Sequence, residues 1–322
     1  MIIVSMVLML GLNRSLAFHA CTHVTPSRIL LLVMDKQLIP TTSSCSFQHH
    51  SASTLCSAVK ARTMMLLSNR DEESSSEKGI VRILCLHGKG NNGLSFQTIL
   101  KPLEKVLETR LASRNDMKRV RFDYLTAPFA MEDDGDGCHS KMQWWTLPSG
   151  VRSFNAKEYG GFEQSSALVE NKLLENEYDF ILGHSQGAIL LSALISCDEW
   201  TDRVYGRIKS QPARKQAMGY IFNGSAWPNP FTEQMEGFAY QNKNKLEISE
   251  IKPKTFFVIG ERDTVNPPEG AERVRDAFKQ GGLEVESCYH DGGHSVPVSD
   301  TAVLAEIADW IADLVNQQRQ NK

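Results

Sequence analysis

The sequence predicts an α/β protein in which a mainly parallel β-sheet is covered by helices on both faces. Two observations support this prediction. From Ile80 onward, short β-branched or apolar runs alternate with amphipathic stretches of helical period, and such alternation is typical of parallel strands joined by crossover helices. In addition, the polar motifs come directly after the expected strands, where sheets of this kind bind their ligands.

The period of the apolar residues sets the expected elements. Strands are expected at Val81 to Leu86, Val120 to Leu125, Phe180 to Leu182, Tyr220 to Phe222, Thr255 to Ile259 and Val285 to Tyr289. Helices are expected at Phe96 to Ala112, Ser165 to Glu175, Ala188 to Ile195, Glu269 to Phe278 and Thr301 to Val315. We expect residues 79–318 to form one domain, because α/β folds run to roughly 250 residues as single domains.

Composition argues against several classes of partner. The 322 residues include 35 basic and 38 acidic side chains, whereas nucleic-acid phosphates are met by clustered Lys and Arg, so no nucleic-acid partner is expected. The seven cysteines are scattered without a C-x-x-C pair, which indicates neither a zinc site nor a disulfide framework. The run Glu132 to Gly137 imitates an EF-hand loop, but the twelfth position is Gln143 rather than Glu, so no metal is predicted.

Residues 1–78 differ from the rest and are expected to be a largely unstructured targeting leader and linker. The apolar run Ile2 to Leu12 is too short for a membrane-spanning helix but suits a signal peptide, with small residues following at Ser15 to Ala17. Phe18 to Arg70 is Ser-rich and acid-poor, which is typical of a transit peptide. This leader suggests import into an organelle such as a plastid, or secretory entry; the alternative is an N-terminal extension on a cytoplasmic protein.

A candidate nucleophile, Ser185, lies in the pentapeptide Gly183-His184-Ser185-Gln186-Gly187. This G-x-S-x-G sequence follows a buried strand and precedes an apolar helical stretch, which is the context of a nucleophile elbow. The two glycines allow strand and helix to approach closely around a strained turn. A serine in this position is predicted to act as the nucleophile of a hydrolase.

Serine needs a base to take its proton and an acid to orient that base. In this fold the chain order is Ser, then Asp or Glu, then His. Asp263 and His294 each follow an expected strand in that order, so we predict them as the acid and the base. Glu261 and His290 are the alternatives; His294 is preferred because two flexible glycines precede it.

The oxyanion of the tetrahedral intermediate needs backbone N–H donors. The residue after the nucleophile, Gln186, and Lys89 in the loop after the first expected strand are the predicted donors. His87 is expected to anchor that loop by hydrogen bonds, and His184 to pack locally. The same loop matches G-x-G-x-x-G between Gly88 and Gly93, but no acidic residue ends the next strand, so a dinucleotide-binding enzyme is the weaker reading.

These residues resemble the FSH family of serine hydrolases. The resemblance covers roughly residues 80–315 and rests on Leu86-His87-Gly88 with Asn92-Gly93, Thr126-Ala127-Pro128, Trp144-Trp145, the Ser185 elbow, Gly260 to Asp263 with Val265-Asn266-Pro267, and Gly292-Gly293-His294 with Pro297. It implies an α/β-hydrolase fold without a large lid domain, no cofactor, and hydrolysis of small-molecule carboxylic esters or thioesters by a Ser-His-Asp triad. A non-catalytic small-molecule-binding protein of the same fold is the alternative.

The long connection from Thr126 to Phe162 shows little periodicity, and loops of that length are usually functional. It carries the apolar residues Pro128, Phe129, Met131, Trp144, Trp145 and Phe154. We predict that these residues, above all Pro128, Phe129 and the two tryptophans, line or cover a cleft for an apolar acyl group, since such sites are mostly hydrophobic. The alternative is that Trp144 and Trp145 cap the core.

Overall fold

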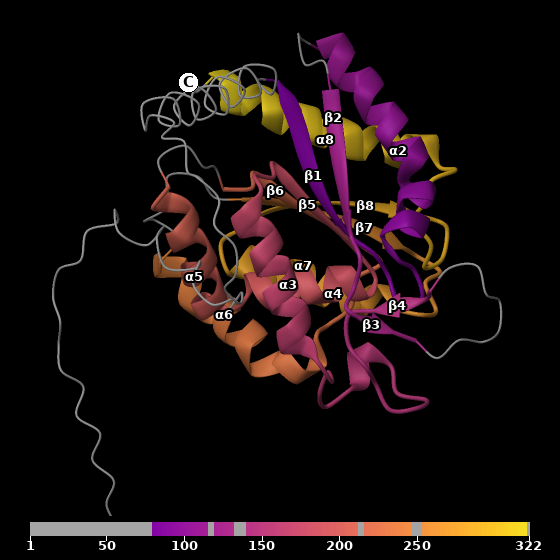
Figure 1. Cartoon of the computed structure of the whole chain (residues 1–322), viewed down its shortest axis with the longest axis vertical. Helices are drawn as coiled ribbons and strands as arrows, with labels where there is room; N and C mark the ends of the chain where they lie inside the picture. The colour runs from indigo at the N-terminus through magenta and orange to yellow at the C-terminus, as the bar shows by residue number, and fades with distance from the viewer. Residues whose placement is uncertain (1–78, 115–118, 132–139, 212–215, 246–252, 321–322) are drawn as a thin grey trace, which may run out of the picture. The chain divides into compact units, whose positions relative to one another are not determined.

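The computed structural model describes residues 79–114, 119–131, 140–211, 216–245 and 253–320. Within them, six strands form one parallel sheet in the order β2-β1-β5-β6-β7-β8 (Figure 1). The strands are β1 (Ile80–Leu86), β2 (Arg119–Leu125), β5 (Phe180–His184), β6 (Gly219–Asn223), β7 (Lys254–Gly260) and β8 (Glu284–His290). All six predicted strands are therefore confirmed, with one or two more residues at their ends.

Helices cover both faces of this sheet (Figure 1). On one face α2 (Gly93–Arg114) and α8 (Thr301–Gln320) lie side by side. The other face carries α3 (Phe162–Glu175), α4 (Gln186–Ile195), α5 (Asp198–Lys209), α6 (Thr232–Lys245) and α7 (Pro268–Gln280). The sequence thus correctly predicts a parallel sheet between two helical layers.

The strand side chains alternate between the cores of the two faces. In β1, Ile83 and Cys85 pack with the residues of α2 and α8, while Leu84 and Leu86 belong to the core of the opposite face. Successive strand residues point to opposite faces, so a strand that is buried on both sides reads as a continuous apolar run. That run is the signal by which the strand is visible in the sequence.

Two helices and a hairpin are not predicted by the period of the apolar residues. Helix α5 is one, although its buried residues Trp200, Val204, Tyr205 and Ile208 have helical spacing. Helix α6 is another, and its polar sequence gives only a weak apolar stripe. The third is a short antiparallel hairpin of β3 (Phe129–Ala130) and β4 (Met142–Gln143) inside the long connection. Two-residue strands are too short to show a period of two.

Several predictions concern residues outside the described ranges, namely the leader at 1–78 and the acidic run Glu132 to Gly137. In the part of the chain that the structure describes, no helix combines the length and apolar character needed to cross a bilayer. The same residues contain no cluster of His, Cys, Asp and Glu suited to a metal ion. The described cysteines, Cys85, Cys197 and Cys288, are free thiols.

Candidate active site

The turn between β5 and α4 holds Ser185 in a strained backbone conformation. Its φ of 53° and ψ of −118° make it the one non-glycine residue with positive φ among those described. Such strain persists where the surrounding structure enforces it and often marks a functional site. Here the Ser185 N–H donates to the carbonyl of Asn223 in β6 at 3.0 Å, which anchors the turn to the sheet.

The two glycines of the pentapeptide are required by close packing. A Cβ atom on Gly183 would lie 2.7 Å from the backbone of Ala188, and one on Gly187 would collide with the carbonyl oxygen of Leu86. Real Cβ atoms essentially never approach that closely. Both positions therefore exclude a side chain, as the elbow prediction requires.

Ser185, His294 and Asp263 form a continuous hydrogen-bonded series. The distance between Nε2 of His294 and Oγ of Ser185 is 2.7 Å. The distance between Nδ1 of His294 and Oδ2 of Asp263 is also 2.7 Å. Residues 109 and 31 positions apart in the chain are thus brought together at the carboxyl ends of β5, β7 and β8, in the relation that nucleophile, base and orienting acid need.

Asp263 is held as an ionised acceptor. Its side chain is 2% exposed, and Oδ1 accepts the N–H groups of Val265 and Asn266 at 2.8 Å each. Burial alone raises the pKa of Asp263, but the hydrogen bonds from His294, Asn266 and Val265 outweigh it and hold this pKa below its usual value. The side chain of Asn266 donates to the Gly224 carbonyl at 2.8 Å and fixes this loop against β6.

The alternative acid and base are placed elsewhere. The side chain of Glu261 is exposed, and its N–H bonds the carbonyl of His290 as part of the β7–β8 edge. His290 is buried and accepts the Gly292 N–H on Nδ1 at 3.2 Å. Neither side chain takes part in the hydrogen-bonded series that ends at Ser185.

The loop after β1 lies directly against Ser185. A Cβ atom on Gly88 would fall 3.1 Å from the Cβ of Ser185 and 2.9 Å from Cδ2 of His184. Lys89, the predicted donor, follows Gly88 with an exposed side chain, and Gln186 begins α4. Of the two predicted oxyanion donors, Gln186 follows Ser185 directly in the chain, and Lys89 follows Gly88, which lies next to Ser185.

His87 anchors this loop. The Ala127 N–H donates to its Nε2 at 3.0 Å, so Nε2 carries the lone pair and Nδ1 carries the proton that bonds the Gly88 carbonyl at 2.7 Å. Burial lowers the pKa of His87, which keeps the ring neutral. With both nitrogens engaged, His87 has none left to serve as a base, which agrees with the anchoring role expected from the sequence.

His184 also packs locally, but close to the proposed base. Its ring stacks on Phe96 with 6.0 Å between centroids and lies 5.2 Å from the ring of His294. Its Nδ1 meets the Asn223 amide at 2.8 Å. The contact of His184 with Asn223 is not readable from the sequence, because it depends on the register between β5 and β6.

Trp144 and Trp145 require a correction. Both side chains are 0% exposed and belong to the core, so no surface of either indole is open to a substrate in this structure. The prediction that they line an acyl cleft does not fit this position. The prediction fails because neighbouring elements can cover an apolar loop residue, which periodicity does not reveal. Tyr159 and Phe162 pack on Trp145, and His87 packs on Trp144.

Two of the other predicted cleft residues, Pro128 and Phe129, remain accessible. Pro128 is exposed and Phe129 is half-buried, with its ring packed against Gly161, where a Cβ atom would collide with it. Phe129 pairs with Gln143 in the β3–β4 hairpin. The next pair of the hairpin includes Met142. The Met142 N–H donates to the carbonyl of Asn91, and the Met142 carbonyl accepts the N–H of Gly90. The hairpin therefore borders the loop that carries Lys89.

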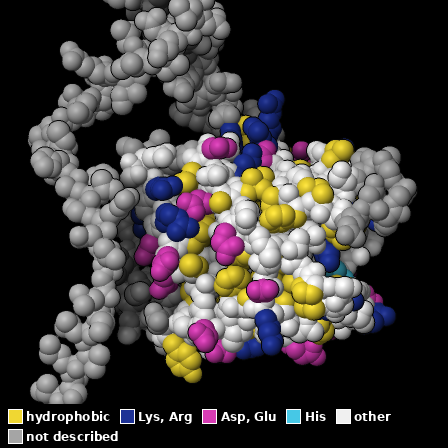
Figure 2. Space-filling view, turned by 60° about the horizontal axis from the view of Figure 1, so that its bottom comes forward, with side chains coloured by type: hydrophobic (Ala, Val, Ile, Leu, Met, Phe, Trp, Pro, Cys, Tyr) yellow, Lys and Arg dark blue, Asp and Glu magenta, His cyan; other side chains and the backbone are white. Residues whose placement is uncertain are grey.

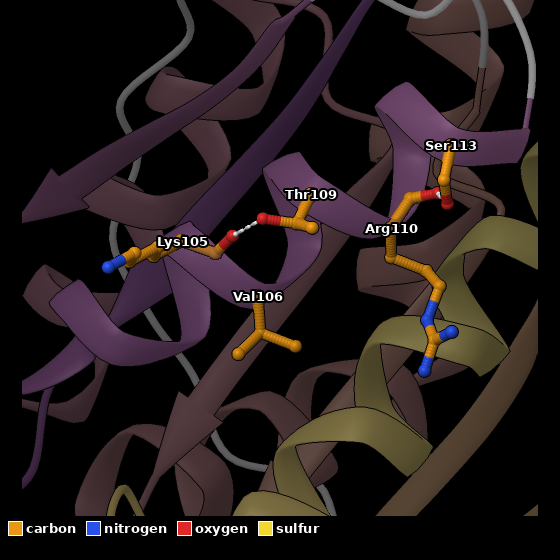
Figure 3. A pocket seen from close by; sticks show the side chains of 5 residues that line it. All are labelled: Lys105, Val106, Thr109, Arg110 and Ser113. Carbon is orange, nitrogen blue, oxygen red and sulfur yellow. Dashed lines mark hydrogen bonds between the residues drawn. The ribbon is translucent and has the colours of Figure 1, made fainter.

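Other surface features lie away from Ser185. A hollow of about 360 Å³ is lined by five residues of the second half of α2, Lys105, Val106, Thr109, Arg110 and Ser113 (Figure 3). Arg110 pairs there with Asp309 of α8 at 3.0 Å. The face drawn in Figure 2 carries basic, acidic and apolar side chains interspersed with one another. We assign neither feature to the site.

Comparisons with known proteins identify the family of this chain. A family model described as serine hydrolase (FSH1) matches residues 77–305. Esterase OVCA2 of Danio rerio is 27% identical over 240 residues, which cover 69% of this chain and 92% of the esterase. An esterase of Anopheles gambiae is 25% identical over 250 residues, 75% of this chain and 81% of its own. The solved structure of acyl-protein thioesterase 2 from Zea mays covers 73% of this chain and 94% of its own, with 19% identity and a TM-score of 0.47.

The family match spans every motif on which the resemblance to this family rests, from the β1 loop through the Ser185 elbow to His294. The resemblance and the α/β-hydrolase fold that it implies are thereby confirmed. The chain belongs to the FSH1 family of serine hydrolases.

Proposed function

We propose that this serine hydrolase cleaves carboxylic esters or thioesters through Ser185, with His294 as base and Asp263 as the orienting acid. The observation that carries the proposal is the pair of 2.7 Å contacts that joins Ser185 to His294 and His294 to Asp263. The strained backbone of Ser185 adds support. The two relatives named above are described as esterases, which favours acyl ester bonds as the substrate class.

The reaction begins when Oγ of Ser185 attacks the carbonyl carbon while Nε2 of His294 takes the hydroxyl proton. The carbonyl oxygen becomes an oxyanion, which accepts hydrogen bonds from the N–H groups of Gln186 and Lys89. His294 then gives its proton to the leaving alcohol or thiol, and an acyl-enzyme remains. Water, deprotonated by His294, attacks the acyl-enzyme and releases the acid and the free serine.

An apolar acyl group is the proposed substrate. Exposed or half-buried apolar side chains border the loop that carries Lys89: Leu94 is 59% exposed at the start of α2, and Phe129 and Met142 of the hairpin are half-buried. Apolar surface beside a reactive centre favours an apolar ligand. A small molecule is thus the expected partner, and the proposed chemistry needs no cofactor.

A fluorophosphonate probe tests the proposal with the full chain. The wild-type protein should be labelled and the Ser185→Ala variant should not, because the probe reacts with an activated serine. Absence of labelling in folded wild-type protein would overturn the proposal. A panel of p-nitrophenyl esters of increasing chain length should show turnover that rises beyond acetate.

Labelling, turnover and cofactor binding together separate the alternative functions. Labelling without turnover of any ester or thioester would favour the non-catalytic binding protein. A change in cofactor fluorescence on mixing with NADPH would favour the dinucleotide-binding enzyme.

A further inference from the structure

We infer that Trp144 is a positioning residue that ties together the two proposed oxyanion donors, the N–H groups of Gln186 and Lys89. The inference rests on the proposed function of the site. It gives Trp144 a role in the reaction without contact with the substrate. Trp144 is fully buried, and its polar groups bond to both sides of the site.

On the side of the elbow, Trp144 is bonded to Gln186. The Trp144 N–H donates to Oε1 of Gln186 at 3.0 Å, and Nε2 of Gln186 lies 3.5 Å from the carbonyl of Trp145. The Gln186 side chain is itself buried. Gln186 thus supplies one proposed donor from its backbone and holds Trp144 and Trp145 with its side chain.

On the side of the β1 loop, the indole of Trp144 is bonded to His87. Nε1 of Trp144 donates to the carbonyl of His87 at 2.7 Å, and the two rings lie 5.3 Å apart. This bond fixes the peptide between His87 and Gly88. The next peptide is fixed by Nδ1 of His87, which bonds the Gly88 carbonyl.

The geometry of the peptide bond carries this restraint to Lys89. In a planar trans peptide the C=O and the N–H point in opposite directions. Fixing the Gly88 carbonyl therefore fixes the direction of the Lys89 N–H. The indole of Trp144 therefore acts through His87 on the direction of the Lys89 N–H. The backbone N–H of Trp144 holds Gln186, which supplies the other proposed donor.

Trp144 is itself held in place from outside the site. Oγ of the fully buried Ser165 in α3 donates to the Trp144 carbonyl. With its N–H, its carbonyl and Nε1 all bonded, Trp144 has little freedom to move. A phenylalanine could fill much of the same space but could not bond the His87 carbonyl.

The neighbouring residue supplies a matched control. Trp145 is equally buried, but its Nε1 has no hydrogen-bond partner, and its ring stacks on Tyr159 with 4.2 Å between centroids. Trp145→Phe therefore removes a similar indole without removing a hydrogen bond. Trp144→Phe removes the indole and leaves the buried His87 carbonyl without that donor.

The first measurement is hydrogen exchange in the full chain, because it does not depend on turnover. In Trp144→Phe the amides of residues 87–90 should exchange about tenfold faster than in wild type, as expected for the loss of one buried hydrogen bond. In Trp145→Phe they should not change. Equal exchange in the two variants would overturn the inference even if the protein hydrolyses no ester.

The second measurement is catalysis on a p-nitrophenyl ester. Trp144→Phe should lower kcat about tenfold or more with little change in KM, since removal of an oxyanion donor costs about 100-fold or more and a displaced donor should cost less. Binding of a trifluoromethyl ketone, which forms an oxyanion on Ser185, should weaken in parallel. Trp145→Phe should keep kcat within about threefold of wild type, as a substitution that removes no hydrogen bond. Equal losses of kcat in both variants would point to core packing alone.

A third variant tests whether the two bonds act together. Gln186→Met removes the side-chain bonds to Trp144 and Trp145 but keeps its backbone N–H. If the inference is correct, Gln186→Met and Trp144→Phe together should cost less than the product of their separate effects, because both loosen one network. Effects that multiply would show that the two residues act independently.

Discussion

The imidazole of His184 packs on that of His294, with ring centroids 5.2 Å apart and planes inclined by 38°. His184 is buried, and burial, followed by repulsion from His294, lowers its pKa to about 3. A neutral ring therefore lies against the proposed base. Because the buried ring stays neutral in the native state, the free energy of unfolding depends on pH.

His184→Phe should make the fold less sensitive to acid. An unfolded His has a pKa near 6.5, so between pH 6.5 and about 3 the unfolded chain binds a proton at His184 that the native state excludes. Stability then falls with falling pH by up to about 1.4 kcal/mol per unit from this residue. Urea unfolding of the full chain between pH 7 and 4 should show a shallower slope in the variant.

His87 and His290, whose pKa values burial also lowers, remain in the variant and keep part of the slope. The measured quantity is the slope of the free energy of unfolding against pH. The free energy itself also changes, because the substitution alters packing and hydrogen bonding. Identical slopes in wild type and variant would mean that His184 takes up its proton in the native state.

Asp263→Asn should lower kcat by about 10³ to 10⁴-fold while the fold is retained, by analogy with the triad acid of other serine hydrolases. The amide keeps the volume of the side chain but cannot stabilise His294 as an imidazolium. Glu261→Gln is the matched control, because Glu261 is exposed and lies two residues away; its kcat should stay within about twofold of wild type. A larger loss in Glu261→Gln than in Asp263→Asn would reverse the assignment of the acid.

The sequence predicts Ser185, Asp263 and His294 as site residues because each follows a strand. The end of each strand is marked by a change from apolar to polar and glycine residues. Position along a parallel sheet is set by the strands, so residues far apart in the chain can be expected to meet. The inner strands β1, β5, β6 and β7 are predictable because burial on both faces leaves a continuous apolar run. The edge strands β2 and β8 are partly exposed and carry charged residues between their apolar ones.

The roles of Trp144 and His184 are not predictable in this way. Whether a loop tryptophan is exposed or buried depends on what packs over it, and Trp144 is contacted by His87 and by Ser165 of α3. The neighbours of His184 depend on strand register and on the path of the β8–α8 loop that brings His294 over it. Both are tertiary relationships, which leave no period in the sequence.

Gly206→Ala should stabilise the protein by about 0.5–1 kcal/mol. Gly206 lies inside helix α5, is exposed and has open space where a Cβ atom would be. Alanine restricts the unfolded chain more than glycine does, without a clash in the helix. The free energy of unfolding in urea tests this, and kcat should not change. A loss of stability would contradict the open, helical position of Gly206 in α5.

Gly88→Ala should impair the site without unfolding the protein. Its Cβ atom would lie 2.9 Å from His184 and 3.1 Å from the Cβ of Ser185, so the loop or the His184 ring must shift by a few tenths of an ångström. Misplacement of reacting groups by about 1 Å can cost roughly 100-fold, and we expect kcat/KM to fall about tenfold for this smaller shift.

Gly90→Asn is the control for that variant. Gly90 lies in the same loop with φ of +85°, and nothing lies within 4 Å of the position of its Cβ atom. Asn tolerates positive φ better than most residues, so Gly90→Asn should keep kcat/KM within about threefold of wild type. Because Gly88 lies next to Ser185 and Gly90 does not, equal losses in the two variants would place the effect in the loop backbone and not in the contact with Ser185.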